Sequence, residues 1–464
     1  MAARESDRHH QMSLLQLAAL LKISMVVPAD HPLLMLKKVL DWAAIREVIT
    51  RRLRFAGHNV DGGRGRPLNL DFYVPALVLM ALKNMTSREM EEYLSENAVA
   101  RVFVDCEHDM EFQIRDHSNL ARVMDSLGAD GLAELNALIV RHAVSSGFAN
   151  EKVLSADTTC QEVPIGYPNE PGILKGLAER CIRLFEKLKG KGKRGLSQLQ
   201  DICGEVVNLC KEHHLFAKTK EEKEKLLRRM IQITQNMLSK SESLAERLTG
   251  EAGRVVRNAR FQLKQLVSVG QALIPQIQHW LKTGLVAKGK ILHVALSDAQ
   301  AIVRNKAGKK VEFGYQYLIN VLGGGYIFAK SFNRPTGESK MPSASLDAYR
   351  QILGEEATPE MFVYDRGGWS QENARALKEE GVEKVGIQPK GRARWHVGKQ
   401  DRRKVLSERG KTEGVIGTLK SAKYGFNKPL ARRSESVRAY GQKSVLSYNL
   451  NKLLRDHSKK AKAA

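Results

Sequence analysis

The stretch MFVYDRGGWSQENARALKEEGVEKVGIQ, residues 361–388, sets the fold class of this chain. It begins with a short apolar strand pattern that ends at Asp365. It continues through a polar segment with helical spacing from Gln371 to Glu380, and it closes on a second strand pattern around Val385 to Gln388. Strand, helix and strand in this order are typical of an alternating α/β pattern. We therefore expect an α/β fold.

The segments before this stretch predict the rest of a mixed sheet. Residues 290–332 hold runs rich in β-branched and aromatic residues that are separated by Gly clusters, which indicates two or three antiparallel strands. A helix near Ser345 to Leu353 leads from them to the first strand of the opening stretch. Much earlier, KVLSA at residues 152–156 predicts another short strand, which ends at Asp157.

Residues 173–284 differ in kind from these segments. They are rich in Lys, Glu, Gln and Leu, nearly free of proline until Pro275, and spaced for helix pairs, so we expect an inserted helical bundle with an exposed loop at 189–195. Cys203, Cys210 and His214 could share a helix face as zinc ligands. However, seven residues of helix separate two sulfurs by about 10 Å, which is too far for one zinc ion.

The N-terminal part is predicted to be helical from residue 40 to 149, after a lead-in at 1–39. An apolar helix from Phe72 to Lys83 is followed by a turn and by Thr86 with Glu89, a capping-box signature that opens a second helix. Such a pair fits a helix-turn-helix that contacts DNA, and it fits an ordinary helical hairpin equally well. A further helix start is expected at residues 116–118.

The charge of the chain favours a polyanionic partner. Its 75 Lys and Arg exceed its 51 Asp and Glu, for a net charge of +24. Residues 390–464 alone hold 21 of these basic residues against 5 acidic ones, a pattern of nucleic-acid binding or of a merely solvated surface. The odd count of five cysteines, the polar start and the lack of a long apolar run favour a cytoplasmic protein without a membrane span.

Two aspartates are placed as ligands of a metal-dependent phosphodiester site would be. Asp157 and Asp365 each follow directly on a predicted strand, where an α/β sheet presents side chains to a crevice. Two divalent cations about 4 Å apart activate a nucleophile and stabilise the leaving oxygen. Mg²⁺ needs only a few carboxylates plus water and substrate phosphate. Each aspartate alone also fits an ordinary turn or cap residue.

The third acid, Glu413, has basic partners on a helix expected from about Arg402 to Lys420. Arg409, Glu413 and Lys420 are four and seven residues apart, so they fall on one helical stripe about 40° wide. A carboxylate between two cations suits a face that meets metal and phosphate together, although an ordinary ion-paired face has the same spacing. The nearby glycines weaken a helix, or mark where DNA lies close: Gly410, Gly414 and Gly417.

These residues resemble the insertion-sequence transposases that carry a DDE active site on an RNase H-like fold. The family signature of Arg, three residues, Glu, six residues and Lys is met by Arg409, Glu413 and Lys420, while Leu406 stands where the family has Tyr. The motifs Asp157-Thr158-Thr159 and Tyr364-Asp365-Arg366-Gly367 are similar to the two aspartate motifs of the family. Residues 86–102 and 116–123 resemble its helical N-terminal region, and residues 161–176 resemble the ISNCY-like group.

The resemblance implies a transposase that cleaves DNA at the ends of an insertion sequence and joins the freed 3′ hydroxyl to target DNA. Asp157, Asp365 and Glu413 would be catalytic and hold two Mg²⁺ ions, with Mn²⁺ as a substitute. Four basic residues would contact DNA phosphates: Arg409, Lys420, Lys423 and Arg366. The working form would be a homodimer or higher oligomer on the terminal inverted repeats and target DNA.

Two alternatives share the basic surface, namely a related nuclease without strand transfer and a non-catalytic DNA-binding repressor derived from a transposase. The expected domains are the lead-in (1–39), an N-terminal helical domain for DNA binding or dimerisation (40–149) and an RNase H-like catalytic domain (150–455). The helical insertion (173–284) interrupts the catalytic domain, and a basic tail (456–464) follows it.

Overall fold

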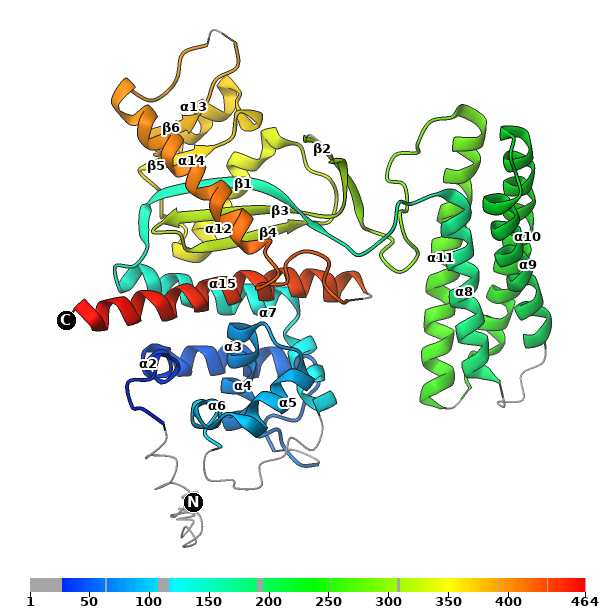
Figure 1. The fold of residues 1–464 in the computed structure, drawn as a ribbon, viewed down its shortest axis with the longest axis horizontal. Coiled ribbons are helices and arrows are strands. Elements are labelled where there is room, and N and C mark those ends of the chain that lie inside the picture. Colours follow the sequence, from blue (N-terminus) through cyan, green and yellow to red (C-terminus); the bar gives the residue numbers. More distant parts are fainter. Residues whose placement is uncertain are drawn as a thin grey trace, which may run out of the picture.

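A computed structural model describes residues 27–62, 65–106, 117–189, 195–251, 253–306, 309–391, 393–431 and 433–463. Most of the predicted lead-in, the centre of the 189–195 loop and Asp116 lie outside the described residues. Figure 1 shows a mixed sheet above a group of N-terminal helices, and a helical bundle to one side. None of the described helices is both long enough and apolar enough to cross a membrane.

Within the described residues, the N-terminal part consists of six helices: α2 (Pro32–Val39), α3 (Trp42–Phe55), α4 (Leu70–Lys83), α5 (Ser87–Glu96), α6 (Ala98–Phe103) and α7 (His117–Ser145). The predicted capping box is confirmed, because Thr86 accepts from the backbone N–H of Glu89 and the Glu89 carboxylate accepts from that of Thr86. Asn84 adopts a left-handed conformation with a φ of 54° and ends α4. The turn between α4 and α5 therefore has defined ends on both sides.

The six strands of the described ranges form one mixed sheet, which confirms the α/β prediction. They are β1 (Asn150–Glu162), β2 (Gln300–Lys306), β3 (Lys309–Gly323), β4 (Ile327–Phe332), β5 (Met361–Tyr364) and β6 (Lys384–Ile387). The order is β2-β3-β1-β5-β6, and β4 pairs with β3. Two of the predicted antiparallel strands are confirmed as β3 and β4. The first predicted run, at residues 291–296, is irregular, and β2, which pairs with β3, begins after it. β1 runs antiparallel to β3 and parallel to β5, which in turn is parallel to β6.

Helices cover both faces of this sheet. On one face lie α12 (Met341–Leu353) and α13 (Gln371–Glu379), together with α7; on the other lies α14 (Lys399–Leu419). The last helix, α15 (Ser434–Ala463), packs against α7, α4 and β4, and it continues through the segment expected to be a basic tail. One hydrophobic core joins the N-terminal helices to the α12 face, so the expected boundary at residue 149 falls inside a shared core.

Residues 170–283 form a four-helix bundle with its own hydrophobic core. Its helices are α8 (Glu170–Leu188), α9 (Leu196–Leu215), α10 (Lys220–Arg247) and α11 (Arg254–Thr283), each packed against its neighbour and α11 against α8. A nearly buried ion pair between Glu170 and Lys290 joins the chain where it enters the bundle to the chain where it leaves. The bundle is therefore inserted between β1 and β2 and stands apart from the sheet (Figure 1).

Candidate active site

Asp365 lies directly after β5, as predicted. Its Oδ1 accepts from the backbone N–H of Arg366 at 2.6 Å and caps a short 3-10 turn at Arg366–Gly368. The same oxygen lies 2.5 Å from Nη2 of Arg409. The side chain remains 41% exposed, so it is anchored by a backbone contact and still open to solvent.

Asp157 lies inside β1, so the prediction that it follows the end of a strand is wrong. β1 continues to Glu162 because β3 pairs with it over residues 154–162, well beyond the apolar run. The parallel pairing with β5 stops earlier, at Ser155 opposite Val363. Asp157 and Asp365 each lie two residues beyond this last pair, and side chains alternate along a strand, so both belong to the face of the sheet on which Ser155 and Val363 lie. Asp157 is also the only residue of 153–161 that is not buried.

Glu413 is linked to Asp365 through the side chain of Arg409. The guanidinium of Arg409 bridges the two acids, because its Nε lies 3.7 Å from Oε1 of Glu413 while its Nη2 contacts Asp365. Helix α14 is held against β1 at this point by a hydrogen bond from the Thr412 hydroxyl to the Ser155 hydroxyl at 2.7 Å, buried in the interface. The structure thus brings Asp365 and Glu413 to one cation on the face to which Asp157 also belongs.

The close approach of α14 to the sheet depends on Gly386 in β6. A Cβ at this position would lie 2.8 Å from a methyl carbon of Val405, so a larger residue would push the helix away. By contrast, a Cβ at Gly410, Gly414 or Gly417 would meet no atom within 4 Å. The outer side of α14 next to Arg409 and Glu413 is therefore an exposed surface with little side-chain bulk.

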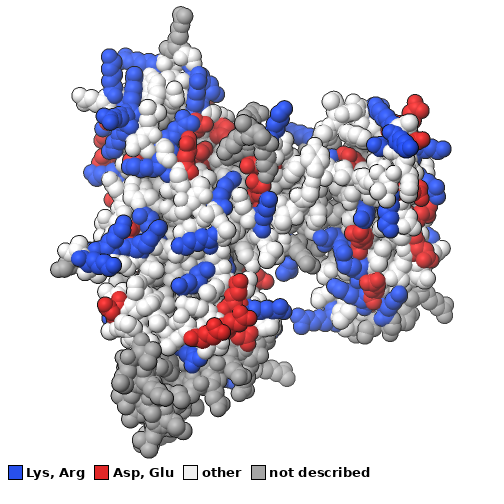
Figure 2. Space-filling model, in the orientation of Figure 1, with Lys and Arg blue, Asp and Glu red and all other residues white. Residues whose placement is uncertain are grey.

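The remaining basic residues of the prediction lie around this surface without being joined in one cluster. Lys420 directly follows α14 as its C-terminal cap residue and is half-buried. Lys423 is exposed, with its ammonium 5.3 Å from the centre of the Tyr424 ring, and Arg366 is exposed beside Asp365. In Figure 2, Lys and Arg side chains gather over the region where Figure 1 places α13 and α14.

Glu338 is a further acidic residue at the site that the sequence did not indicate. Its carboxylate accepts from the Thr158 hydroxyl at 2.8 Å and from the Tyr364 hydroxyl at 2.5 Å. Thr158 and Tyr364 are the neighbours of Asp157 and Asp365 in the chain, and they lie on the opposite face of the sheet. Burial, followed by the negative charge of Glu338, raises the pKa of Tyr364, so this hydroxyl remains a donor. Glu338 therefore ties β1 to β5 directly beneath the two aspartates.

The donor chemistry of the three carboxylates suits Mg²⁺, although they are not gathered as a ready-made site. Within the described ranges, no group of three or more His, Cys, Asp or Glu side chains is arranged to hold a metal ion. The guanidinium of Arg409 occupies the space between Asp365 and Glu413. Two cations about 4 Å apart, each with oxygens about 2 Å away, span carboxylates separated by roughly 8 Å. Acids that share one guanidinium fall within that span.

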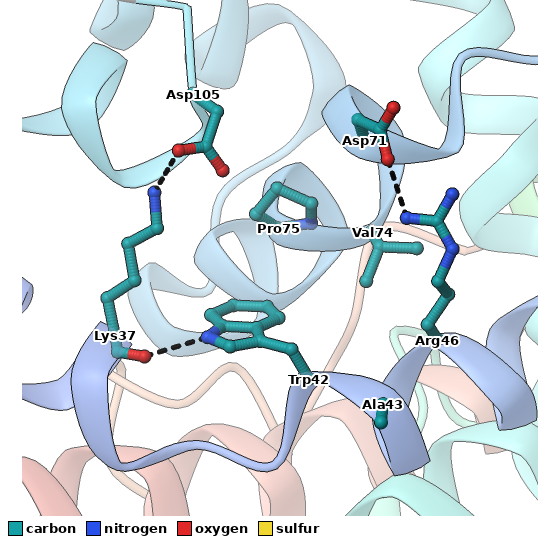
Figure 3. Close-up of a pocket in the computed structure, with 8 residues that line it drawn as sticks. All are labelled: Lys37, Trp42, Ala43, Arg46, Asp71, Val74, Pro75 and Asp105. Carbon is teal, nitrogen blue, oxygen red and sulfur yellow. Dashed lines mark hydrogen bonds and ion pairs between the residues drawn. The ribbon is translucent and has the colours of Figure 1, made fainter. Parts of the chain in front are cut away.

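Two other features lie away from the carboxylates. A cavity of about 260 Å³ lies among α2, α3 and α4. Figure 3 shows the two ion pairs at its border, Lys37 with Asp105 and Arg46 with Asp71. Trp42 forms part of its wall, and its indole N–H donates to the backbone oxygen of Lys37. In the bundle, Cys203 is buried in the helical core, where its thiol contacts that of Cys181.

Comparison with known proteins finds a similarity in the N-terminal part. Residues 21–126 match a family model described as a transposase domain (DUF772). No curated protein and no solved structure matches the chain.

Proposed function

Starting from the transposase domain at residues 21–126, we propose that the chain is a DDE transposase with Asp157, Asp365 and Glu413 as its catalytic acids. The observation that carries the proposal is the Arg409 bridge, which joins an acid after β5 to an acid on α14. Three acids that are remote in sequence then share one face of a mixed sheet flanked by helices, which is the architecture that the RNase H-like resemblance implies.

In this proposal the three carboxylates hold two Mg²⁺ ions, or Mn²⁺ in their place. The ions supply an activated nucleophile and stabilise charge on the leaving oxygen. Asp365 presents a carboxylate that is fixed by the backbone N–H of Arg366. Arg409 leaves the acids and contacts a DNA phosphate, since a guanidinium binds phosphate oxygens in pairs. The reaction is cleavage at the ends of the element, followed by strand transfer into target DNA.

The basic residues around the acids fix the DNA without reading its sequence. We expect Arg366, Lys420 and Lys423 to contact phosphates on either side of the cut, because such contacts position a duplex and carry no sequence information directly. The flat outer side of α14 leaves room for the DNA backbone. The net charge of +24 supports DNA as the partner, and we expect a homodimer or higher oligomer on the two ends of the element.

The test is metal-dependent cleavage by the Asp365→Ala variant, using duplexes that carry the DNA flanking the gene and a plasmid as target. We expect nicking and joining in Mg²⁺ to be abolished and DNA binding to be retained. Folding should change little, because the ion pair of Asp365 with Arg409 is partly exposed and such pairs contribute about 1 kcal/mol or less. Asp347→Ala removes an exposed acid of α12 and serves as the matched control.

Three results separate this proposal from its alternatives. Cleavage by Asp365→Ala at the wild-type rate would refute the assignment of that residue. Cleavage without joined products in the wild type would indicate a nuclease without strand transfer. Binding of the flanking DNA with neither product, in Mg²⁺ and in Mn²⁺, would indicate a non-catalytic DNA-binding repressor.

A further inference from the structure

Helix α11 differs in charge from the other three helices of the bundle. Asp and Glu account for 51 of the 464 residues, yet none of them lies among the 30 residues of α11. The helix carries five basic residues: Arg254, Arg257, Arg260, Lys264 and Lys282. Helices α8, α9 and α10 each mix both signs. The bundle therefore has one helix of a single charge sign.

Three of the five basic residues of α11 face outward on one stripe, together with Phe261. Arg254, Arg257, Phe261 and Lys264 follow at steps of three, four and three residues, which keeps them within about 80° around the helix. All four are exposed, and Phe261 is 63% exposed despite its apolar ring. The opposite face is buried in the bundle core through residues such as Val256, Leu263 and Val267. We call these four outward residues the α11 stripe.

The cations of the α11 stripe are not neutralised within the part of the chain that the structure describes. None of its arginines and lysine has a carboxylate oxygen within 4.0 Å there. On the neighbouring helix α10, by contrast, Lys220 and Arg228 face Glu224, and Arg229 contacts Glu205 at 2.8 Å. Lys264 borders a hollow that also contains Glu242 and Glu246, so the most positive part of the stripe is its N-terminal end.

The first turn of α11 adds to this positive end. Its N-cap residue, Gly253, supplies no side chain to the first backbone N–H groups. Uncapped N–H groups and the positive end of the helix dipole favour an anion. Because α8 starts and α11 ends where the bundle joins the sheet, α11 begins at the remote end of the bundle, as Figure 1 shows. The helix spans about 45 Å at 1.5 Å per residue.

We propose that the α11 stripe binds the phosphate backbone of duplex DNA, at a place separate from the carboxylates. The inference rests on the proposed function for the identity of the polyanion, and it gives the insertion a role as an arm that grips DNA. Arg254 and Arg257 contact phosphates, and the Phe261 ring packs on the sugars between them. Contacts of this kind do not depend on base sequence and weaken as counterions are added.

The test compares wild type with a double variant that carries both Arg254→Gln and Arg257→Gln. Binding to a 40-base-pair duplex of random sequence is measured between 50 and 200 mM salt in EDTA, without cleavage. Each lost phosphate contact lowers the slope of log affinity against log salt by about 0.9. We expect a slope reduced by about 2 and an affinity at 100 mM reduced by about tenfold or more. Phe261→Ala should lower affinity and leave the slope unchanged.

The matched control is a double variant on α10 that carries both Arg228→Gln and Arg229→Gln. It removes the same charge from the same bundle, but both arginines face glutamates, so DNA binding should stay within about twofold of wild type. An equal loss of DNA affinity in both double variants would overturn the assignment to α11, because the net charge of the protein would then explain the binding. Circular dichroism and thermal unfolding of each variant exclude loss of the fold.

The failures of the two proposals are distinguishable. If the α11 double variant binds DNA as wild type does, the stripe proposal falls, while the cleavage test on Asp365 is unaffected. If wild type itself binds duplex DNA without salt dependence, both proposals fail. A change in sedimentation of the α11 double variant with unchanged DNA affinity would assign the stripe to contact between two copies of the chain, and it would overturn the proposal.

Discussion

Lys443 is a buried cation in the contact between α15 and the N-terminal helices, and it leads to a pH-dependent prediction. Its side chain is 5% exposed. Its ammonium donates to the backbone oxygen of Met85, in the turn between α4 and α5, at 2.8 Å. The nearby charged and aromatic groups are Glu89 and Tyr440, whose ring centre lies 5.3 Å from the ammonium. Burial lowers the pKa of Lys443 from 10.5 to about 8, against the opposing influence of Glu89.

The lowered pKa translates into a cost of carrying this charge in the folded state. One pKa unit is about 1.4 kcal/mol, so the shift from 10.5 to about 8 corresponds to about 3 kcal/mol. Below pH 8 the lysine is protonated in both the folded and the unfolded chain, and the full cost is present. Between pH 8 and 10.5 the folded chain releases the proton while the unfolded chain keeps it, so this group adds stability as pH rises.

We expect Lys443→Met to keep most of the packing, to remove the charge cost and to lose the hydrogen bond to Met85, which costs about 1–3 kcal/mol. At pH 7 the variant should equal wild type or exceed it by up to about 2 kcal/mol. At pH 10.5 wild type should be the more stable of the two. The difference in free energy of unfolding thus changes by about 3 kcal/mol across the range.

The measurement is urea unfolding of both proteins at half-unit steps from pH 7 to 10.5, compared at each pH so that other titrating groups cancel. Lys452→Met on the same helix is the control, because its ammonium pairs with Asp456 at 3.0 Å. A difference between wild type and Lys443→Met that stays constant over this range would refute the reasoning. It would mean that the lysine is as well solvated in the folded chain as in the unfolded one.

Two further predictions concern the support of the carboxylate site. Glu338→Ala leaves the hydroxyls of Thr158 and Tyr364 without their common acceptor, and each lost hydrogen bond costs about 1–3 kcal/mol. We expect Mg²⁺-dependent cleavage to slow at least tenfold while DNA binding is kept. Cleavage at the wild-type rate would show that the tie between β1 and β5 is dispensable. Thr412→Val leaves the Ser155 hydroxyl without its partner. In urea unfolding, the double variant with Thr412→Val and Ser155→Ala should therefore lose about 1 kcal/mol less stability than the two single variants lose together. Strict additivity would contradict a coupled pair.

The sequence predicted those parts of the site that depend on local pattern. Asp365 follows a four-residue apolar strand and precedes two glycines, and both signals lie within eight residues. Glu413 and Arg409 share a helix face through spacing alone, and the structure joins them in an ion pair. Glu338 has no such signal, because its role arises only when the chain after β4 returns beneath β1 and β5. Contacts of that kind depend on topology rather than on neighbouring residues.

The location of Asp157 follows from the same distinction. The polar residues after it, from Thr158 to Glu162, give little sign of a strand, and they adopt one because the long β3 offers partners to residue 162. The second neighbour of β1 is β5, which ends at Tyr364. The side of β1 that faces β5 is therefore open at Asp157, two residues beyond the last paired residue, Ser155. The position of the first acid is therefore set by the length of β5. An insertion that lengthened β5 would bury Asp157 and displace Asp365 together, whereas one that lengthened β1 beyond Glu162 would move neither.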